Sequence, residues 1–178
     1  MFADIAQFNK VSDYLPILNG SLLADLLIIF ATFYLPNIIG SNQLANWYKK
    51  YGLSAVIADT LILVIGMIIA RALYSKIFGH QFNILKFIFL VLVIQIIHDF
   101  VFYFGIINTL PKGVNNMIDM FKDYAQEVSA GAVLGDSIMI TMAVLFASLF
   151  ANYNSNINII ILIVVVYLMP YIVHAKTI

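Results

Sequence analysis

Five long apolar segments, separated by shorter polar stretches, limit what this chain can fold into. They cover residues 15–35, 53–73, 84–107, 130–151 and 157–173. A bilayer core is about 30 Å thick and takes roughly 20 apolar helical residues to cross, so each segment is close to the length of a transmembrane helix, although the last is short. The apolar runs are continuous rather than alternating, which excludes the strands of a membrane β-barrel. The sequence therefore predicts an all-α integral membrane bundle of five transmembrane helices in a single domain, residues 1–178.

The composition supports this class and excludes several others. Hydrophobic residues make up 63% of the chain and charged residues 10%, against roughly 45–50% and about 25% in a soluble domain. The net charge is +0, so the chain lacks the basic face that nucleic-acid phosphates require. It contains no cysteine, which excludes disulfides and thiolate metal sites. We expect the lipid bilayer to be the main partner, and we expect neither nucleic acid nor a cofactor to bind.

Three polar regions are expected at the membrane surface. The connections 37–52 and 112–129 mix aromatic and charged residues, as amphipathic helices at the interface do. Residues 1–14 repeat apolar side chains at helical spacing, which predicts either a short interfacial helix or a frayed tail. Arg71 ends the second apolar segment, and we expect its side chain to snorkel to the interface. Basic residues are divided almost equally between the two sides, so the positive-inside rule does not determine the orientation.

An internal repeat relates the second apolar segment to the fourth. Residues 52–70 align with residues 129–147 without a gap, and Asp59 aligns with Asp136. Both copies place small residues along one helical face, which allows another helix backbone to approach closely. In the second copy this face contains Ser129, Ala132, Asp136, Ala143 and Ala147.

The repeat extends upstream of these helices. Residues 48–51 and 121–124 share a pattern of aromatic, lysine, any residue and tyrosine, and a Leu-Pro pair precedes each of them. The repeated unit is a helix, a Leu-Pro pair, an interfacial helix and a second helix. Repeat A covers about 15–73 and repeat B about 84–151, and 157–173 forms an extra helix. Because each unit crosses twice, the repeats are parallel and related by a pseudo-twofold axis along the membrane normal. We expect the second and fourth segments to pack on each other across it.

Four aspartates lie within apolar segments: Asp25, Asp59, Asp99 and Asp136. A helical rise of about 1.5 Å per residue places all four in one layer, somewhat off the midplane. An intramembrane carboxyl group costs roughly 2.5–3.5 kcal/mol, so these groups are tolerated only if they are protonated, paired or in contact with water. The layer is consistent with an ion or proton site, and equally with protonated groups that hold helices together.

Polar neighbours extend this candidate site. The hydroxyls of Thr60 and Ser137, which also align in the repeat, can donate hydrogen bonds or ligate a cation, and an oxygen-only set suits a proton, Na⁺, Mg²⁺ or Ca²⁺. His98 precedes Asp99, but adjacent helical residues point about 100° apart, so we expect no direct pair. His98 serves either as a proton relay or as a helix–helix contact. Gln95, one turn before Asp99, and Tyr103, one turn beyond it, are the two candidate partners of Asp99.

Residues 98–137 also carry a resemblance. This stretch contains the short motifs HDF, LPKG, NMID, FKDYA and GDS. It resembles multispanning membrane proteins of large DNA viruses that infect algae and other protists, a group without an assigned activity. The resemblance implies a location in a virion's internal membrane or in a membrane of the infected cell. It also implies partners among virion or other membrane proteins, and the small size of the chain favours a homo-oligomer.

The function is left open between two main classes. In one, the aspartate layer conducts or exchanges protons or small cations. In the other, the protein is a structural or assembly component that does not transport. The chain has no GxSxG, HExxH or glycine-rich phosphate motif, so we do not expect an enzyme.

Overall fold

The computed structural model describes residues 2–36, 42–128 and 131–175. These residues are helical apart from turns and connections, and they contain no strand. Four helices are long and apolar enough to cross a membrane, which indicates an integral membrane protein. They are α1 (Tyr14–Tyr34), α4 (Leu53–Phe78), α5 (Ile84–Phe102, continued by the π-helical turn Tyr103–Ile107) and α8 (Ser155–Val173).

The described residues form three further α-helices, and a short 3-10 helix, Val11–Asp13, leads into α1. α3 (Asn42–Tyr51) and α6 (Asn116–Val128) occupy the two long connections, so the predicted helices there are confirmed, and their place at the membrane surface stays a prediction. α7 (Gly131–Phe150) follows α6, and its apolar part, Leu134–Phe150, is shorter than the four spans. The fifth span therefore stays a prediction. Parts of both connections, residues 37–41 and 129–130, lie outside the described residues.

Local sequence signals determine where the helices begin and end. Pro36 lies two residues after the last residue of α1, and proline is common at this position because it has no N–H with which to continue the helix. Gly52 (φ +52°) separates α3 from α4, and Gly79 (φ +77°) ends α4, because glycine adopts positive φ without a Cβ clash. The side chain of Asn83 accepts hydrogen bonds from the first turn of α5, and that of Asn154 does the same for α8.

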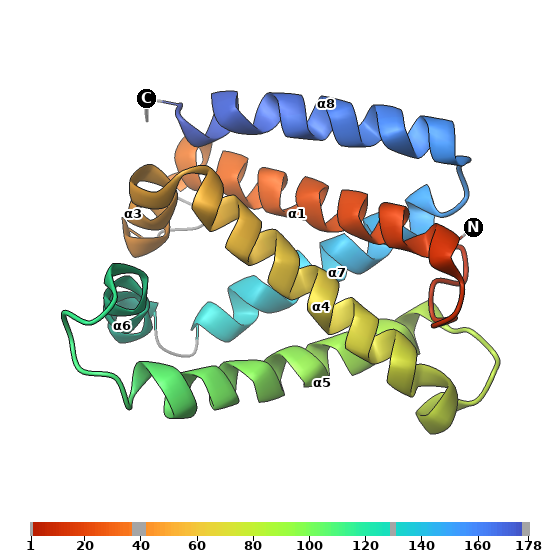
Figure 1. Cartoon of the computed structure of the whole chain (residues 1–178), viewed down its shortest axis with the longest axis horizontal. Coiled ribbons are helices and arrows are strands. Elements are labelled where there is room, and N and C mark those ends of the chain that lie inside the picture. The colour runs from red at the N-terminus through yellow and green to blue at the C-terminus, as the bar shows by residue number, and fades with distance from the viewer. Residues whose placement is uncertain (1, 37–41, 129–130, 176–178) are drawn as a thin grey trace.

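The long helices form a ring (Figure 1). α1 packs on α4, α4 on α5, α5 on α7, and α7 back on α1, while α8 packs mainly on α1. The most extensive contact is that between α1 and α7. The expected packing of the second apolar segment on the fourth is wrong, because α4 and α7 lie diagonally in the ring and touch over only a few residues.

Gly20 explains why α1 became the partner of α7. A Cβ at Gly20 would lie 2.5 Å from the backbone nitrogen of Ala147 and 2.6 Å from the carbonyl oxygen of Ala143. Both alanines are fully buried. The small-residue face predicted on this segment is therefore a close-approach surface over its described part, but it receives α1 rather than α4.

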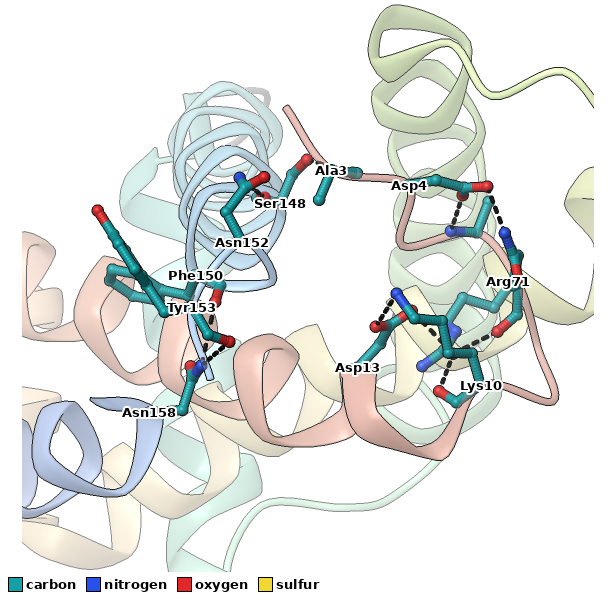
Figure 2. A network of polar contacts seen from close by, with 12 residues as sticks. Ala3, Asp4, Lys10, Asp13, Arg71, Ser148, Phe150, Asn152, Tyr153 and Asn158 are labelled. Carbon is teal, nitrogen blue, oxygen red and sulfur yellow. Dashed lines mark hydrogen bonds and ion pairs between the residues drawn. The ribbon is translucent and has the colours of Figure 1, made fainter. Parts of the chain in front are cut away.

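The segment before α1 is neither an interfacial helix nor a frayed tail. Residues 2–10 are not helical, and Ile5 is fully buried in the core of the bundle. The backbone of Ala3 is fixed to α7, because Ser148 Oγ donates to the Ala3 carbonyl oxygen at 2.6 Å (Figure 2). Both expectations for this segment are wrong, since the burial of Ile5 outweighs the local helical pattern.

Arg71 does not snorkel to open interface. Its side chain is buried, and the N-terminal segment surrounds it (Figure 2). The guanidinium donates to the carbonyl oxygen of Gln7 and, at 2.8 Å, to that of Lys10, and it lies 3.6 Å from the Asp13 carboxylate. The N-terminal segment thus supplies the polar partners that we expected from the headgroup region.

The outer surface of the ring is apolar. On α4, large side chains recur every four residues on the exposed side. They are Ile57, Leu61, Ile65 and Ile69, with exposed fractions of 41–59%. Exposed apolar stripes of this kind are rare in soluble monomers, and they are the surface that lipid would cover.

α3 and α6 lie side by side at one end of the ring (Figure 1). The carboxylate of Glu127 in α6 accepts hydrogen bonds from the backbone N–H groups of Asn42 and Gln43, both at 2.9 Å. A carboxylate at a helix N-terminus satisfies unpaired donors and favours the helix dipole. This contact holds the two connecting helices together over the end of the ring.

Candidate functional site

Three of the four predicted aspartates line a single cavity of about 790 Å³. Asp59 comes from α4, Asp99 from α5 and Asp136 from α7. α3, α6 and the π-helical turn Tyr103–Ile107 contribute most of the remaining wall, together with Ile28 of α1. These three carboxyl groups therefore face a common space, and the expectation that they form one layer within the membrane stays a prediction.

Asp59 is held by the first connecting helix. Trp47 Nε1 donates a hydrogen bond to its carboxylate at 2.9 Å. The hydroxyl of Tyr48 interacts with both Asp59 and Asp25. Burial raises the pKa of the Tyr48 hydroxyl well above its ordinary value, and the Asp25 and Asp59 carboxylates raise it further. Tyr48 therefore stays protonated and acts as a donor between the two acids.

Asp99 has two partners on its own helix. Gln95 Nε2 donates to its carboxylate at 2.6 Å, so the predicted one-turn contact is confirmed. His98 Nδ1 lies 3.2 Å from the same oxygen, so the expectation that these neighbours do not pair is wrong. Their Cα–Cβ bonds diverge, but rotation about the side-chain bonds brings the two groups together. His98 also stacks on Phe102, with 5.8 Å between ring centres.

Asp136 differs from the other cavity acids. None of the described residues hydrogen-bonds to its carboxyl group, although Asp99 and Asp59 act on it electrostatically. Tyr124 lies close by in α6. Burial raises the pKa of the Tyr124 hydroxyl, and the Asp136 carboxylate adds to the shift, so the phenol stays neutral. Asp136 is thus the carboxyl group of this cavity that depends most on what fills it.

Asp25 belongs to a separate, sealed contact. It is fully buried and is not part of the cavity wall. Tyr48 donates to one carboxylate oxygen at 3.2 Å and Thr60 to the other at 3.3 Å. Asp25 therefore joins α1, α3 and α4, and Thr60 serves this contact rather than a cavity site.

Ser137 does not share the position that its alignment with Thr60 predicted. It is half-buried and does not line the cavity. Its carbonyl oxygen accepts a hydrogen bond from Thr141 Oγ1 at 2.8 Å. Of the seven predicted site residues, the cavity therefore brings together Asp59, His98, Asp99 and Asp136, and it leaves out Asp25, Thr60 and Ser137.

No family model, curated protein or solved structure matches this chain.

The cavity does not have the geometry of a metal site. Among the described residues, no three His, Asp or Glu side chains come together closely enough to hold a metal ion. Divalent cations in proteins take six or more oxygen ligands or keep several waters. The carboxyl groups are spread over the wall instead, which suits protons or a larger ligand better than a bound metal.

The aromatic lining of the cavity is not predicted by the sequence. Trp47 and Phe121 pack with 4.8 Å between ring centres, and Phe121 meets Phe102 edge-on at 5.6 Å. Trp47 and Phe121 were placed at the membrane surface because their amphipathic helices alone indicate no buried partner. The aligned patterns 48–51 and 121–124 are the sequence feature that indicates this lining, since Tyr48 and Phe121 occupy equivalent places in them and both line the cavity.

A π-helical turn forms part of the same wall. The turn Tyr103–Ile107 continues α5 directly after Phe102, one helical turn beyond Asp99. Its residues Tyr103, Phe104 and Ile107 line the cavity. π-helical turns inside α-helices are rare and occur frequently at functional sites. This irregularity therefore agrees with a functional role for the cavity.

Proposed function

We propose that this integral membrane protein exchanges protons or small cations through the cavity lined by Asp59, Asp99 and Asp136. The observation that carries the proposal is that three helices each direct a carboxyl group into one space of about 790 Å³. Carboxyl groups that only hold helices together need protein partners. Asp136 has none among the described residues, so water, a proton or a ligand must satisfy it.

The proton is the ion that the site suits best. The described residues offer no metal cluster, whereas the His98 imidazole, 3.2 Å from the Asp99 carboxylate, can take up a proton at one ring nitrogen and release one from the other. The neutral hydroxyl of Tyr124 supplies a donor near Asp136. These groups form a set of exchangeable sites along one wall.

The cavity is closed toward the end of the ring that lies opposite α3 and α6, where the N-terminal segment packs. Leu63 and Met139 line it and belong to the buried core that continues in that direction. Transport across the membrane would then require a second conformation that opens this core. Alternating access of this kind is commonly achieved by one repeat moving against the other.

The order of helices in the ring supports the predicted repeat. A twofold axis relating repeat A to repeat B exchanges α1 with α5, α3 with α6 and α4 with α7. The contact of α1 with α4 then corresponds to that of α5 with α7, and the contact of α4 with α5 to that of α7 with α1; all four are present. α3 and α6 meet each other, as elements related by the axis would. We infer that both halves contribute one repeated aspartate, Asp59 and Asp136, to the cavity.

The alternative is a membrane component that does not transport, in a virion or an infected-cell membrane, as the resemblance to viral proteins implies. The specific observation in its favour is Asp25, whose carboxylate is saturated by Tyr48 and Thr60 and which acts only between helices. Under this alternative the cavity acids are protonated and inert.

Proton flux separates the two functions. We would reconstitute the protein in liposomes that contain a pH-sensitive dye, impose a pH gradient and compare the wild type with the Asp59→Asn, Asp136→Asn double variant. Asp123→Asn is the matched control, because Asp123 is an exposed acid on α6 that pairs with Lys112 outside the cavity. We expect the wild type and the control to dissipate the gradient and the double variant to lose this activity.

Two results would overturn the proposal. One is a folded wild type that gives no more flux than empty liposomes. The other is a double variant that keeps full flux. Size-exclusion chromatography and circular dichroism establish that each variant is folded.

A further inference from the structure

The cavity is much larger than proton exchange requires. At about 790 Å³ it falls in the range of roughly 300–1,000 Å³ that is typical of sites for small organic ligands. A water molecule takes up only about 30 Å³ in the liquid. The space therefore indicates a ligand in addition to protons.

The charge of the wall selects for a cation. Asp59, Asp99 and Asp136 are acidic, and none of the described residues that line the cavity is lysine or arginine. His98 is the single basic side chain in this lining, and it is already paired with Asp99. An anionic ligand would meet three acids without a compensating charge.

Three aromatic rings line the same cavity beside the acids. Phe121 packs on Trp47 with 4.8 Å between ring centres and on Phe102 with 5.6 Å, and all three line the cavity. Aromatic faces attract cations, above all organic cations with a diffuse charge and a weak hydration shell. The same rings also provide apolar surface for the uncharged part of such a ligand.

The open side of the cavity faces the outside of the ring. Ala58 on α4 and Ile96 and Phe100 on α5 line the cavity and are themselves exposed. α4 and α5 lie far apart at the α3–α6 end and converge toward the other end (Figure 1). A lipophilic molecule dissolved in the bilayer would therefore reach the acids between these two helices.

We propose that the cavity binds a lipophilic organic cation, with its charged centre beside Asp59, Asp99 and Asp136 and its apolar groups against Trp47, Phe102 and Phe121. The inference rests on the proposed function, because the acids that exchange protons are those that neutralise the bound cation. The cation and protons then compete for the same carboxylates, so that binding of the cation releases protons, as in an exchanger.

Trp47 gives a direct way to test this. It is the single tryptophan of the chain and it lines the cavity, so its fluorescence reports on the site. The probe is tetraphenylphosphonium, and tetraphenylborate is its control, since it has the same four phenyl groups and the opposite charge. The Asp99→Asn, Asp136→Asn double variant removes two acids and leaves the Trp47–Asp59 hydrogen bond in place. Asp123→Asn again serves as the control variant.

We expect tetraphenylphosphonium to change Trp47 fluorescence in a saturable manner and tetraphenylborate not to do so. The double variant should bind about tenfold more weakly or worse, since each acid contributes charge pairing in a site of low polarity. Equal binding of both ions, or unchanged affinity in a folded double variant, would overturn the inference. If the flux depends on the acids but the probe does not bind, the inference is overturned and the proposed function stands. If the probe binds but no flux is measured, the proposed function is overturned instead.

Discussion

At the scale of single residues, the four intramembrane aspartates divide into two kinds. Asp25 has a donor on each carboxylate oxygen and no access to the cavity. Asp136 faces the cavity without a hydrogen-bond partner among the described residues. A carboxyl group whose two oxygens accept hydrogen bonds from the protein contributes to stability. A carboxyl group without such partners is available to a ligand and contributes to function.

This division predicts different effects of removing each acid. Asp25→Ala should lower the free energy of unfolding by about 1–3 kcal/mol, because it leaves the buried hydroxyls of Tyr48 and Thr60 without their acceptor. Asp136→Ala should change it by no more than about 0.5 kcal/mol. Unfolding in mixed micelles, followed by circular dichroism, measures both. Equal losses in the two variants would show that Asp136 is also a structural contact.

The parts of the site that depend on local interactions were predictable from the sequence. The one-turn spacing was sufficient for Gln95 and Asp99, and apolar surroundings were sufficient to select the four aspartates. Trp47 and Tyr48 were missed because their partners, Asp59 and Asp25, lie on other helices. The direct contact of His98 with Asp99 depends on side-chain rotation, which helical spacing does not determine.

At the scale of helices, the close approach of α1 and α7 depends on Gly20. Gly20→Ala should lower the free energy of unfolding by about 1–3 kcal/mol, because its Cβ would press against the backbone of Ala143 and Ala147 and the helices would have to separate. Gly66→Ala is the matched control. A Cβ there would meet its nearest neighbour, Val91, at 3.9 Å.

The control should be neutral or stabilising by up to about 1 kcal/mol, because alanine favours a helix over glycine. Thermal unfolding in detergent distinguishes the two variants. If Gly20→Ala is as stable as Gly66→Ala, the backbones of α1 and α7 are not in close contact, and the described order of the ring is incorrect at this point.

Helix positions were predictable and helix partners were not. The described long helices begin and end near the predicted segments, because continuous apolar runs, prolines and capping asparagines act locally. The partner of the small-residue face on α7 was predicted incorrectly. The repeat alignment pairs this face with the similar face of α4, whereas the close contact is made by Gly20 of α1. The conformation of the N-terminal segment could not be predicted, since the burial of Ile5 and the polar environment of Arg71 depend on contacts between segments that are distant in the sequence.

At the scale of the whole molecule, the protein is a ring of helices that is apolar on its outer surface and carries acids inside. Ile57 and Leu61 belong to the exposed stripe of α4, while Asp59 between them faces the cavity. Within a bilayer this arrangement places the carboxyl groups in the cavity and not on the exposed apolar stripe. The central claim is therefore that water and ions reach the cavity of the membrane-embedded protein.

Cysteine accessibility tests this claim most directly, since the chain has no native cysteine. Gly135→Cys places a thiol on the cavity wall, where a Cβ meets nothing within 4 Å, and Leu61→Cys places one on the outer stripe. Thiols react as thiolates, which form only where water is present. In liposomes, we predict that a charged, water-soluble thiol reagent labels the first variant rapidly and the second hardly at all. Equally slow labelling of both folded variants would show that the cavity is dry and would contradict the account.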